Sequence, residues 1–146
     1  APYWDSYARG TIVGLSRSSN RDHIVLAGLQ SIALQTYDVL QAMRSDYGGE
    51  IAHLEVDGGA CVNDYLMQLQ ADLLDCSVMR PQNVEVTAKG AAYLAALSAG
   101  IVADTLQLSS LTRIEHEFRP SMAESERQAL LSGWHRAVNR ARNWVE

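Results

Sequence analysis

The sequence contains little cysteine and no long apolar segment, and each shortage excludes a class of protein. The two cysteines, Cys61 and Cys76, lack the spacing of a metal-binding pair, so we expect reduced, buried thiols. No apolar run approaches the ~18 residues that a membrane-spanning helix requires. Residues 1–5 include neither an initiator methionine nor the basic and apolar regions of a signal peptide. These features predict a soluble, cytoplasmic protein whose first residue results from truncation.

Positive charge is also scarce, which argues against polyanionic partners. The chain has 12 lysines and arginines against 17 aspartates and glutamates, giving a net charge of −5. Such a chain repels nucleic acid and acidic membranes, so we expect neither as a partner. Its 47% hydrophobic and 20% charged residues are typical of a globular protein, and 146 residues fit one domain.

Hydrophobic spacing in the first half predicts an α/β fold. After a loop that carries a short strand at residues 11–15, a helix is expected over 21–47, with Asn20 as its N-cap and Gly48 at its end. Residues 24–34 are apolar nearly all round, which predicts burial on most sides of that helix.

A βαβ unit is predicted next, with its two strands parallel. Its parts are a strand at 51–57, a helix at 63–75 and a strand at 76–80 that Pro81 stops. The helix expected over 87–100 is rich in alanine, which allows it to pack very close to a neighbouring sheet.

The last third is predicted to be irregular over 104–110, extended over 112–119 and helical over about 121–146. Ser121 and Glu124 have the spacing of a capping box at the start of that helix. An apolar stripe along it is assigned mainly to core packing, with subunit contact as the alternative; its members are Leu131, Trp134, Val138, Ala141 and Val145.

The segment from Val56 to Asn63 is the strongest candidate for a binding site. A strand there ends in Gly58 and Gly59 and leads directly into a helix, whose first amides are free to meet a polar or phosphorylated ligand. Asn63 can cap that helix or bind the ligand. On these residues alone, a tight turn without function is the favoured interpretation.

Four ordered blocks of sequence resemble the FGGY family of carbohydrate kinases, and within it the kinases that phosphorylate glycerol. They are Ala-Pro-Tyr-Trp-Asp with Ala-Arg-Gly in residues 1–10, Gly-Thr-Ile-Val-Gly-Leu at 10–15 with His23-Ile24 and Ala27, Gly-Gly-Ala-Cys-Val-Asn at 58–63 with Leu66-Met67-Gln68, and Thr-Ala-Lys-Gly-Ala-Ala-Tyr-Leu-Ala at 87–95. The resemblance implies an actin-like ATPase fold, two ribonuclease-H-like domains with ATP or ADP and Mg²⁺ between them. Its mixed sheet would be flanked by helices.

The same resemblance assigns nucleotide contacts and leaves catalysis elsewhere. Gly59 and Asn63 match family positions that contact the adenine nucleotide, and Gly58 and Ala60 would shape that contact through their backbone. The phosphate loop, the catalytic aspartate and the glycerol-binding residues of the family all precede the matched region. No catalytic or metal-binding residue is therefore assigned in this chain.

These absences predict that residues 1–146 are part of the family's C-terminal domain and inactive alone. A sheet of two or three strands would expose an apolar edge, so we expect a marginally stable or homo-oligomeric chain. The alternatives are another FGGY sugar kinase, a catalytically silent nucleotide-sensing module, and an interaction domain that uses the last helix.

Other polar and aromatic groups receive structural interpretations. The four histidines are scattered without metal-ligand spacing. Arginines 136, 140 and 142 are read as a solvated helix face rather than phosphate contacts. Tyr3, Trp4 and Tyr7 are expected to anchor their loop, with a pocket lining as the alternative.

Overall fold

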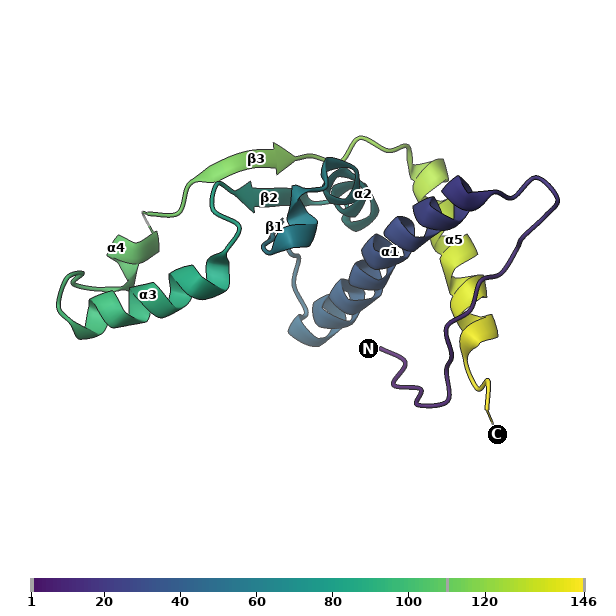
Figure 1. The fold of residues 1–146 in the computed structure, drawn as a ribbon, viewed down its shortest axis with the longest axis horizontal. Helices are drawn as coiled ribbons and strands as arrows, with labels where there is room; N and C mark the ends of the chain where they lie inside the picture. The colour runs from purple at the N-terminus through teal and green to yellow at the C-terminus, as the bar shows by residue number, and fades with distance from the viewer. Residues whose placement is uncertain (1, 110, 146) are drawn as a thin grey trace.

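The computed structural model describes residues 2–109 and 111–145 and has a small mixed sheet with helices around it (Figure 1). Its elements follow in the order α1 (Arg21–Tyr47), β1 (His53–Glu55), the 3-10 turn η1 (Gly59–Val62), α2 (Asp64–Leu74), β2 (Ser77–Pro81), α3 (Val86–Ser98), α4 (Thr105–Ser109), β3 (Ile114–Phe118) and α5 (Glu124–Ala141).

The sheet has the strand order β1-β2-β3. Strands β1 and β2 run parallel, with His53 opposite Ser77, and α2 connects them. Strand β3 runs antiparallel to β2, with Val78 opposite Phe118. The predicted mixed sheet and its parallel βαβ pair are therefore confirmed.

The hydrophobic core forms around α2, which lies between the sheet and the helices α1 and α5 (Figure 1). Eight of its eleven residues are buried, from Leu66 to Leu74 with Gln68 as the exception. Full burial of a leucine stabilises a fold by about 1.5–3 kcal/mol, so this one helix contributes much of the free energy of folding. Partners from the other elements include Ala33, Leu34, Val78, Phe118 and Leu131.

Helix α1 has the predicted bounds because both of its ends are capped. The Asn20 side chain accepts a hydrogen bond from the His23 amide at 3.1 Å, and His23 Nδ1 accepts one from the Asn20 amide at 3.2 Å. At the other end Gly48 adopts the left-handed conformation, φ 69°, and donates to the Arg44 carbonyl. Glycine adopts that conformation without the steric cost that a Cβ imposes.

The predicted burial of α1 on most sides is wrong for residues 24–32. Ile24, Val25, Leu26 and Ile32 are each at least 40% exposed, whereas Ala33 and Leu34 are buried against α2. Only one side of the helix meets other described residues, so an all-round apolar sequence leaves an apolar face in solvent.

The structure differs from simple sequence expectation in three further local features. Residues 11–15 are extended but pair with no strand in the described chain. Helix α3 has no buried residue and lies with α4 at the end of the molecule away from α5, so its alanines do not pack close to the sheet (Figure 1). Residues 105–109 form the short helix α4 instead of irregular chain; Ser110 is outside the described residues.

The last helix begins and ends inside its predicted limits. It spans Glu124–Ala141, and its N-cap Ala123 makes no side-chain cap. Ser121 does not form the expected capping box because its amide and hydroxyl donate to Asp72 instead. Residues 142–145 are not helical, and Glu146 is outside the described residues.

The apolar stripe of α5 packs inside the molecule at Leu131 and Trp134, which confirms core packing there. Trp134 Nε1 donates to the buried carboxylate of Asp38 on α1 at 2.7 Å, and His135 Nε2 lies 3.2 Å from the other oxygen of that carboxylate. Val145, predicted to extend the stripe, is 40% exposed.

Within the described residues, no helix has both the length and the apolar character to cross a membrane. Both cysteines are free and buried, as expected.

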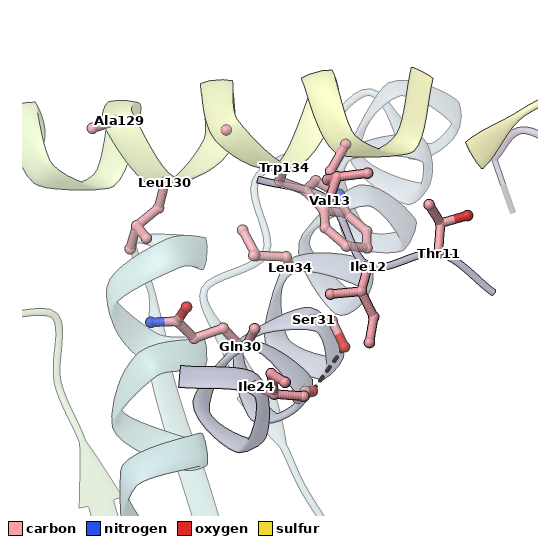
Figure 2. A pocket seen from close by; sticks show the side chains of 14 residues that line it. Thr11, Ile12, Val13, Ile24, Gln30, Ser31, Leu34, Ala129, Leu130 and Trp134 are labelled. Atoms are coloured by element: carbon pink, nitrogen blue, oxygen red, sulfur yellow. Dashed lines mark hydrogen bonds between the residues drawn. The ribbon is translucent and has the colours of Figure 1, made fainter. Parts of the chain in front are cut away.

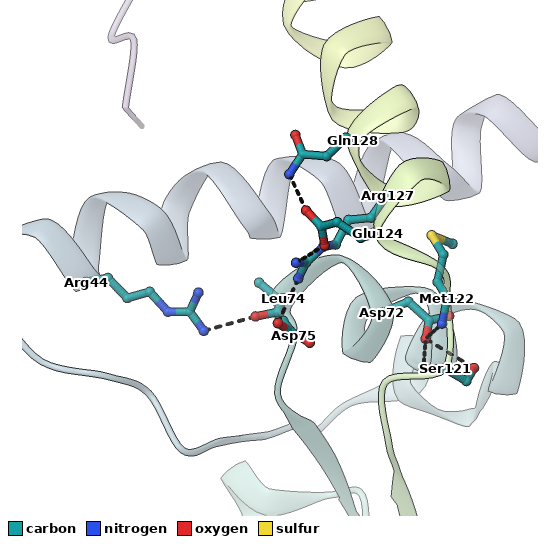
Figure 3. Close-up of polar contacts among 9 residues, drawn as sticks. All are labelled: Arg44, Asp72, Leu74, Asp75, Ser121, Met122, Glu124, Arg127 and Gln128. Atoms are coloured by element: carbon teal, nitrogen blue, oxygen red, sulfur yellow. Dashed lines mark hydrogen bonds and ion pairs between the residues drawn. The ribbon is translucent and has the colours of Figure 1, made fainter.

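A buried carboxylate on α2 fixes the connection from β3 to α5 (Figure 3). Asp72 Oδ1 accepts from the Ser121 amide at 2.7 Å and the Met122 amide at 3.1 Å. It also accepts from the side chains of Ser121 and Gln68. Asp72 itself is 8% exposed, so its carboxylate depends mainly on these protein donors for hydrogen bonds.

We predict that Asp72→Ala lowers the free energy of unfolding by about 2–4 kcal/mol, because two backbone amides lose a charged acceptor in a buried position. Urea denaturation followed by circular dichroism measures the change. Asp46→Ala, at an exposed position on α1, is the control and should have little effect. Equal stability of the Asp72→Ala variant and the parent would contradict the assignment.

Candidate functional site

The candidate site is the connection between β1 and α2. After β1, the Val56 amide donates to the Met79 carbonyl at 3.1 Å, which extends the parallel pairing by one residue. Gly58 then turns the chain away from the sheet, and its amide donates to the Val84 carbonyl at 2.9 Å. The turn is therefore fastened to both β2 and the segment that follows β2.

Gly58 has a backbone conformation that other residues rarely adopt. Its φ of 75° and ψ of 177° lie in a region that is essentially restricted to glycine, at a cost of about 1–3 kcal/mol for a residue with a Cβ. Gly59 starts η1 and has no such restriction. The two adjacent glycines thus have different roles: Gly58 sets the direction of the chain, and Gly59 leaves the backbone uncovered.

The surface of this turn is open. No atom lies within 4 Å of the position that a Cβ would occupy at Gly58 or at Gly59. Gly59 and Ala60 are exposed, while Cys61 on the inner side of the turn is 1% exposed and belongs to the core. Burial raises the pKa of the Cys61 thiol, which stays protonated. A ligand can approach the outer face of the turn, and the protein supports its inner face.

Asn63 is the N-cap of α2, as the sequence suggested. Its Oδ1 accepts from the Leu66 amide at 3.0 Å, and its backbone carbonyl accepts from the Met67 amide. Within the described part of the chain, no partner is recorded for its side-chain nitrogen. Capping therefore uses the acceptor of this amide and leaves two N–H groups for a ligand.

A cavity of about 360 Å³ lies on the other side of Asp57, between the sheet and α3. Its lining includes Val56, Met79, Lys89, Tyr93 and Ile114, but none of Gly58, Gly59, Ala60 or Asn63. Lys89 Nζ donates to Thr112 Oγ1 at 3.1 Å and lies 5.1 Å from the centre of the Tyr93 ring. The predicted nucleotide contacts thus lie outside this cavity.

A larger groove of about 530 Å³ separates α1 from α5, with residues 11–13 along its rim (Figure 2). Its lining is mostly apolar, including Ile12, Ile24, Leu34, Leu130 and Trp134. The polar side chain of Ser31 is already bonded to the Gly28 carbonyl at 2.7 Å. The groove has the character of a packing surface.

The four histidines make contacts outside the turn. His23 caps α1, and His53 is 3.7 Å from Glu55. The ring of His116 is tilted by 57° to that of Phe118, with 4.4 Å between the ring centres, and His135 contacts Asp38. No group of three metal-binding side chains occurs among residues 2–109 and 111–145.

Arginines 136 and 140 are exposed, in agreement with a solvated helix face, whereas Arg142 lies 5.0 Å from the centre of the Tyr3 ring. Trp4 is 86% exposed and Tyr7 is 54% exposed, so these two aromatic residues do not anchor the loop within this chain.

Sequence reasoning missed one residue at the site. Arg80 on β2 donates to the carbonyl of Cys61 inside the turn and to the carboxylate of Asp64 at the start of α2. A single arginine in a short strand has no sequence pattern around it that indicates a role at the site. Arg80 reaches the turn only because β2 pairs with β1 and β3.

Comparison with known proteins shows the family to which this chain belongs. Residues 1–99 match the family model described as the FGGY family of carbohydrate kinases, C-terminal domain. This match covers more than half of the chain, and the chain therefore belongs to the FGGY family of carbohydrate kinases.

Two curated relatives are glycerol kinases. The chain is 51% identical over all of its 146 residues to a glycerol kinase of Clostridium botulinum and 54% identical over 99% of its length to a glycerol kinase of Dechloromonas aromatica. It spans 29% of the length of each relative.

A solved structure confirms the predicted fold class. The crystal structure of Plasmodium falciparum glycerol kinase with ADP matches 97% of this chain and 28% of that chain, with a TM-score of 0.84 and 35% identity. The chain thus has part of the ribonuclease-H-like, actin-like ATPase fold of this family.

We predict that alanine lowers stability at one of the two adjacent glycines and leaves it unchanged at the other. Gly58→Ala should lower the free energy of unfolding by about 1–3 kcal/mol, because its φ of 75° and ψ of 177° disfavour a Cβ. Gly59→Ala should have almost no effect on stability, since its Cβ meets open space. Thermal melts of both variants measure the difference. Equal losses at the two positions would be inconsistent with the backbone described here.

Proposed function

We propose that this chain provides the adenine-nucleotide contacts of an ATP-dependent glycerol kinase. Such an enzyme transfers the γ-phosphoryl group of ATP to a terminal hydroxyl of glycerol and forms glycerol 3-phosphate. The main support is the open glycine turn at residues 58–60, in a chain that is 51% identical along its whole length to a glycerol kinase. That identity favours glycerol over the other substrates of FGGY kinases.

In the proposed complex the nucleotide lies on the outer face of the turn. Gly59 lets the base or ribose approach the backbone closely because it has no side chain, and Gly58 and Ala60 set the shape of the contact. Asn63 donates from the side-chain nitrogen that its capping bond leaves available. The amino end of α2, just behind the turn, adds a favourable partial positive charge for an anionic ligand.

The reacting groups are assigned to parts of the kinase outside this chain. When bound with ATP, Mg²⁺ would neutralise charge on the phosphates, and the described residues contain no group of three or more His, Cys, Asp or Glu side chains placed to hold a metal ion. We therefore propose that the metal ion, the phosphate loop, the residue that accepts the glycerol proton and the glycerol contacts all lie elsewhere. Residues of this chain bind and orient the nucleotide.

The exposed apolar surfaces fit a role within a larger molecule. The open face of α1, at Ile24, Val25 and Ile32, and the groove between α1 and α5 would be unfavourable in water. We propose that residues 1–146 form part of the family's C-terminal domain and that these surfaces pack against the rest of a cytoplasmic kinase or a second subunit of a homo-oligomer.

Three substitutions of Asn63 distinguish its role as the N-cap of α2 from its proposed contact with the nucleotide. Asn63→Asp keeps the cap oxygen and removes the N–H donors, so we expect unchanged stability and at least a tenfold loss of ADP affinity. Asn63→Ala should lose the same affinity and also about 1 kcal/mol of stability. Asn63→Ser, which keeps a cap without the amide, is the matched control and should bind ADP as weakly as Asn63→Asp.

Calorimetric titration of ADP into the full-length kinase gives the affinities, and thermal melts give the stabilities. Wild-type affinity in the Asn63→Asp and Asn63→Ser variants would remove Asn63 from the nucleotide site. Failure of the unmodified kinase to bind ADP, or to phosphorylate glycerol, would contradict the proposed function itself.

A further inference from the structure

Arg80 is the side chain that connects the sheet to the candidate nucleotide turn. It lies on the middle strand β2, on the same face as the buried Val78, two residues earlier. Its side chain is only 12% exposed. A charged group so far removed from solvent requires several polar partners, and its partners define what it does.

The guanidinium holds the turn and α2 together. Arg80 Nη1 donates to the Cys61 carbonyl at 3.1 Å and to Asp64 Oδ1 at 2.6 Å. Cys61 is the third residue of η1, and Asp64 is the first residue of α2. One nitrogen therefore bonds both segments that flank Asn63, the residue between them.

Two contacts from β3 fix the guanidinium itself. Glu115 Oε2 accepts from Arg80 Nε at 2.9 Å, and the centre of the Phe118 ring is 5.2 Å from the guanidinium carbon. The hydrogen bond to Asp64 raises the pKa of Arg80 further above its usual value, so the charge is present at every physiological pH. Strand β3 thus orients Arg80, and Arg80 orients the turn.

The opposite end of α2 is held by an equivalent but separate set of contacts (Figure 3). Arg127 of α5 pairs with Asp75 at 3.1 Å and with Glu124, and its side chain is 18% exposed. Arg44 of α1 donates to the Leu74 carbonyl at 3.0 Å. Arg80 therefore holds the end of α2 near the candidate site, and Arg127 and Arg44 hold the end that is remote from it.

We propose that Arg80 is a positioning residue for nucleotide binding: by bonding the Cys61 carbonyl and Asp64, it holds the turn of Gly59 and the side chain of Asn63 in the geometry that receives adenine nucleotide. The inference rests on the proposed function, since it concerns the same turn. It extends that function by naming the group that keeps an exposed turn rigid before the ligand arrives. Preorganisation of this kind increases affinity because the ordering cost is met in advance.

The test compares Arg80→Ala with Arg127→Ala in the full-length kinase. Arg80→Ala should raise the dissociation constant for ADP and the KM for ATP at least tenfold and leave the KM for glycerol unchanged. Arg127 is buried to a similar extent and holds the other end of α2. Arg127→Ala should therefore change nucleotide affinity less than threefold. Arg80→Lys keeps the charge without the planar fork and should recover only part of the lost affinity.

Glu115→Gln tests whether β3 acts through Arg80. It should weaken ADP binding about two- to fivefold in the wild-type background and have no further effect in the Arg80→Ala background. Equal weakening by Arg80→Ala and Arg127→Ala would show a general loss of structure and overturn the inference, as would wild-type ADP affinity in Arg80→Ala.

Failure of the inference can be distinguished from failure of the proposed function. If the unmodified kinase binds ADP and Asn63→Asp weakens it, but Arg80→Ala binds ADP normally, only the positioning role is wrong. If the unmodified kinase does not bind ADP, the proposed function is wrong and the inference falls with it.

Discussion

Burial of α2 is the constraint on which the rest of this structure depends. The helix is covered by α1, the sheet and α5 at once, and eight of its eleven residues are buried. Because it is held on these sides, its amino end is fixed in space, and so is the turn before it. Polar contacts complete the arrangement, with Asp72 joined to the β3–α5 connection and arginines at both ends of the helix.

The candidate site uses this rigid helix to present an exposed backbone. A turn made of Gly58, Gly59 and Ala60 would be flexible in isolation, since glycine has the largest conformational freedom. Here Gly58 is bonded to Val84, Cys61 is buried and bonded to Arg80, and Asn63 caps α2. A surface that a ligand can approach is thereby combined with a scaffold that these contacts hold in place.

The exposed apolar faces of α1 and α3 have the same kind of composition as the core. Residues 24–34 of α1 are apolar nearly all round, but the described chain buries only Ala33 and Leu34 among them. Helix α3, rich in alanine, has no buried residue at all. Both helices have the composition of buried elements and lack the layers that would bury them, which fits a chain that spans 29% of the length of its curated relatives.

The sequence by itself determined the elements whose signals are local. Capping by Asn20 and Gly48 set the limits of α1, Asn63 set the start of α2, and the glycine pair with its family resemblance located the candidate turn. Tertiary structure decided everything that depends on long-range contact. It made Ser121 a hydrogen-bond donor to Asp72 instead of a helix cap, and it left residues 11–15 without a partner strand among the described residues. It also exposed Ile24 and Val25 and brought the side chain of Arg80 to the turn. Periodicity shows that a face is apolar, but only the packing of distant segments shows what covers it.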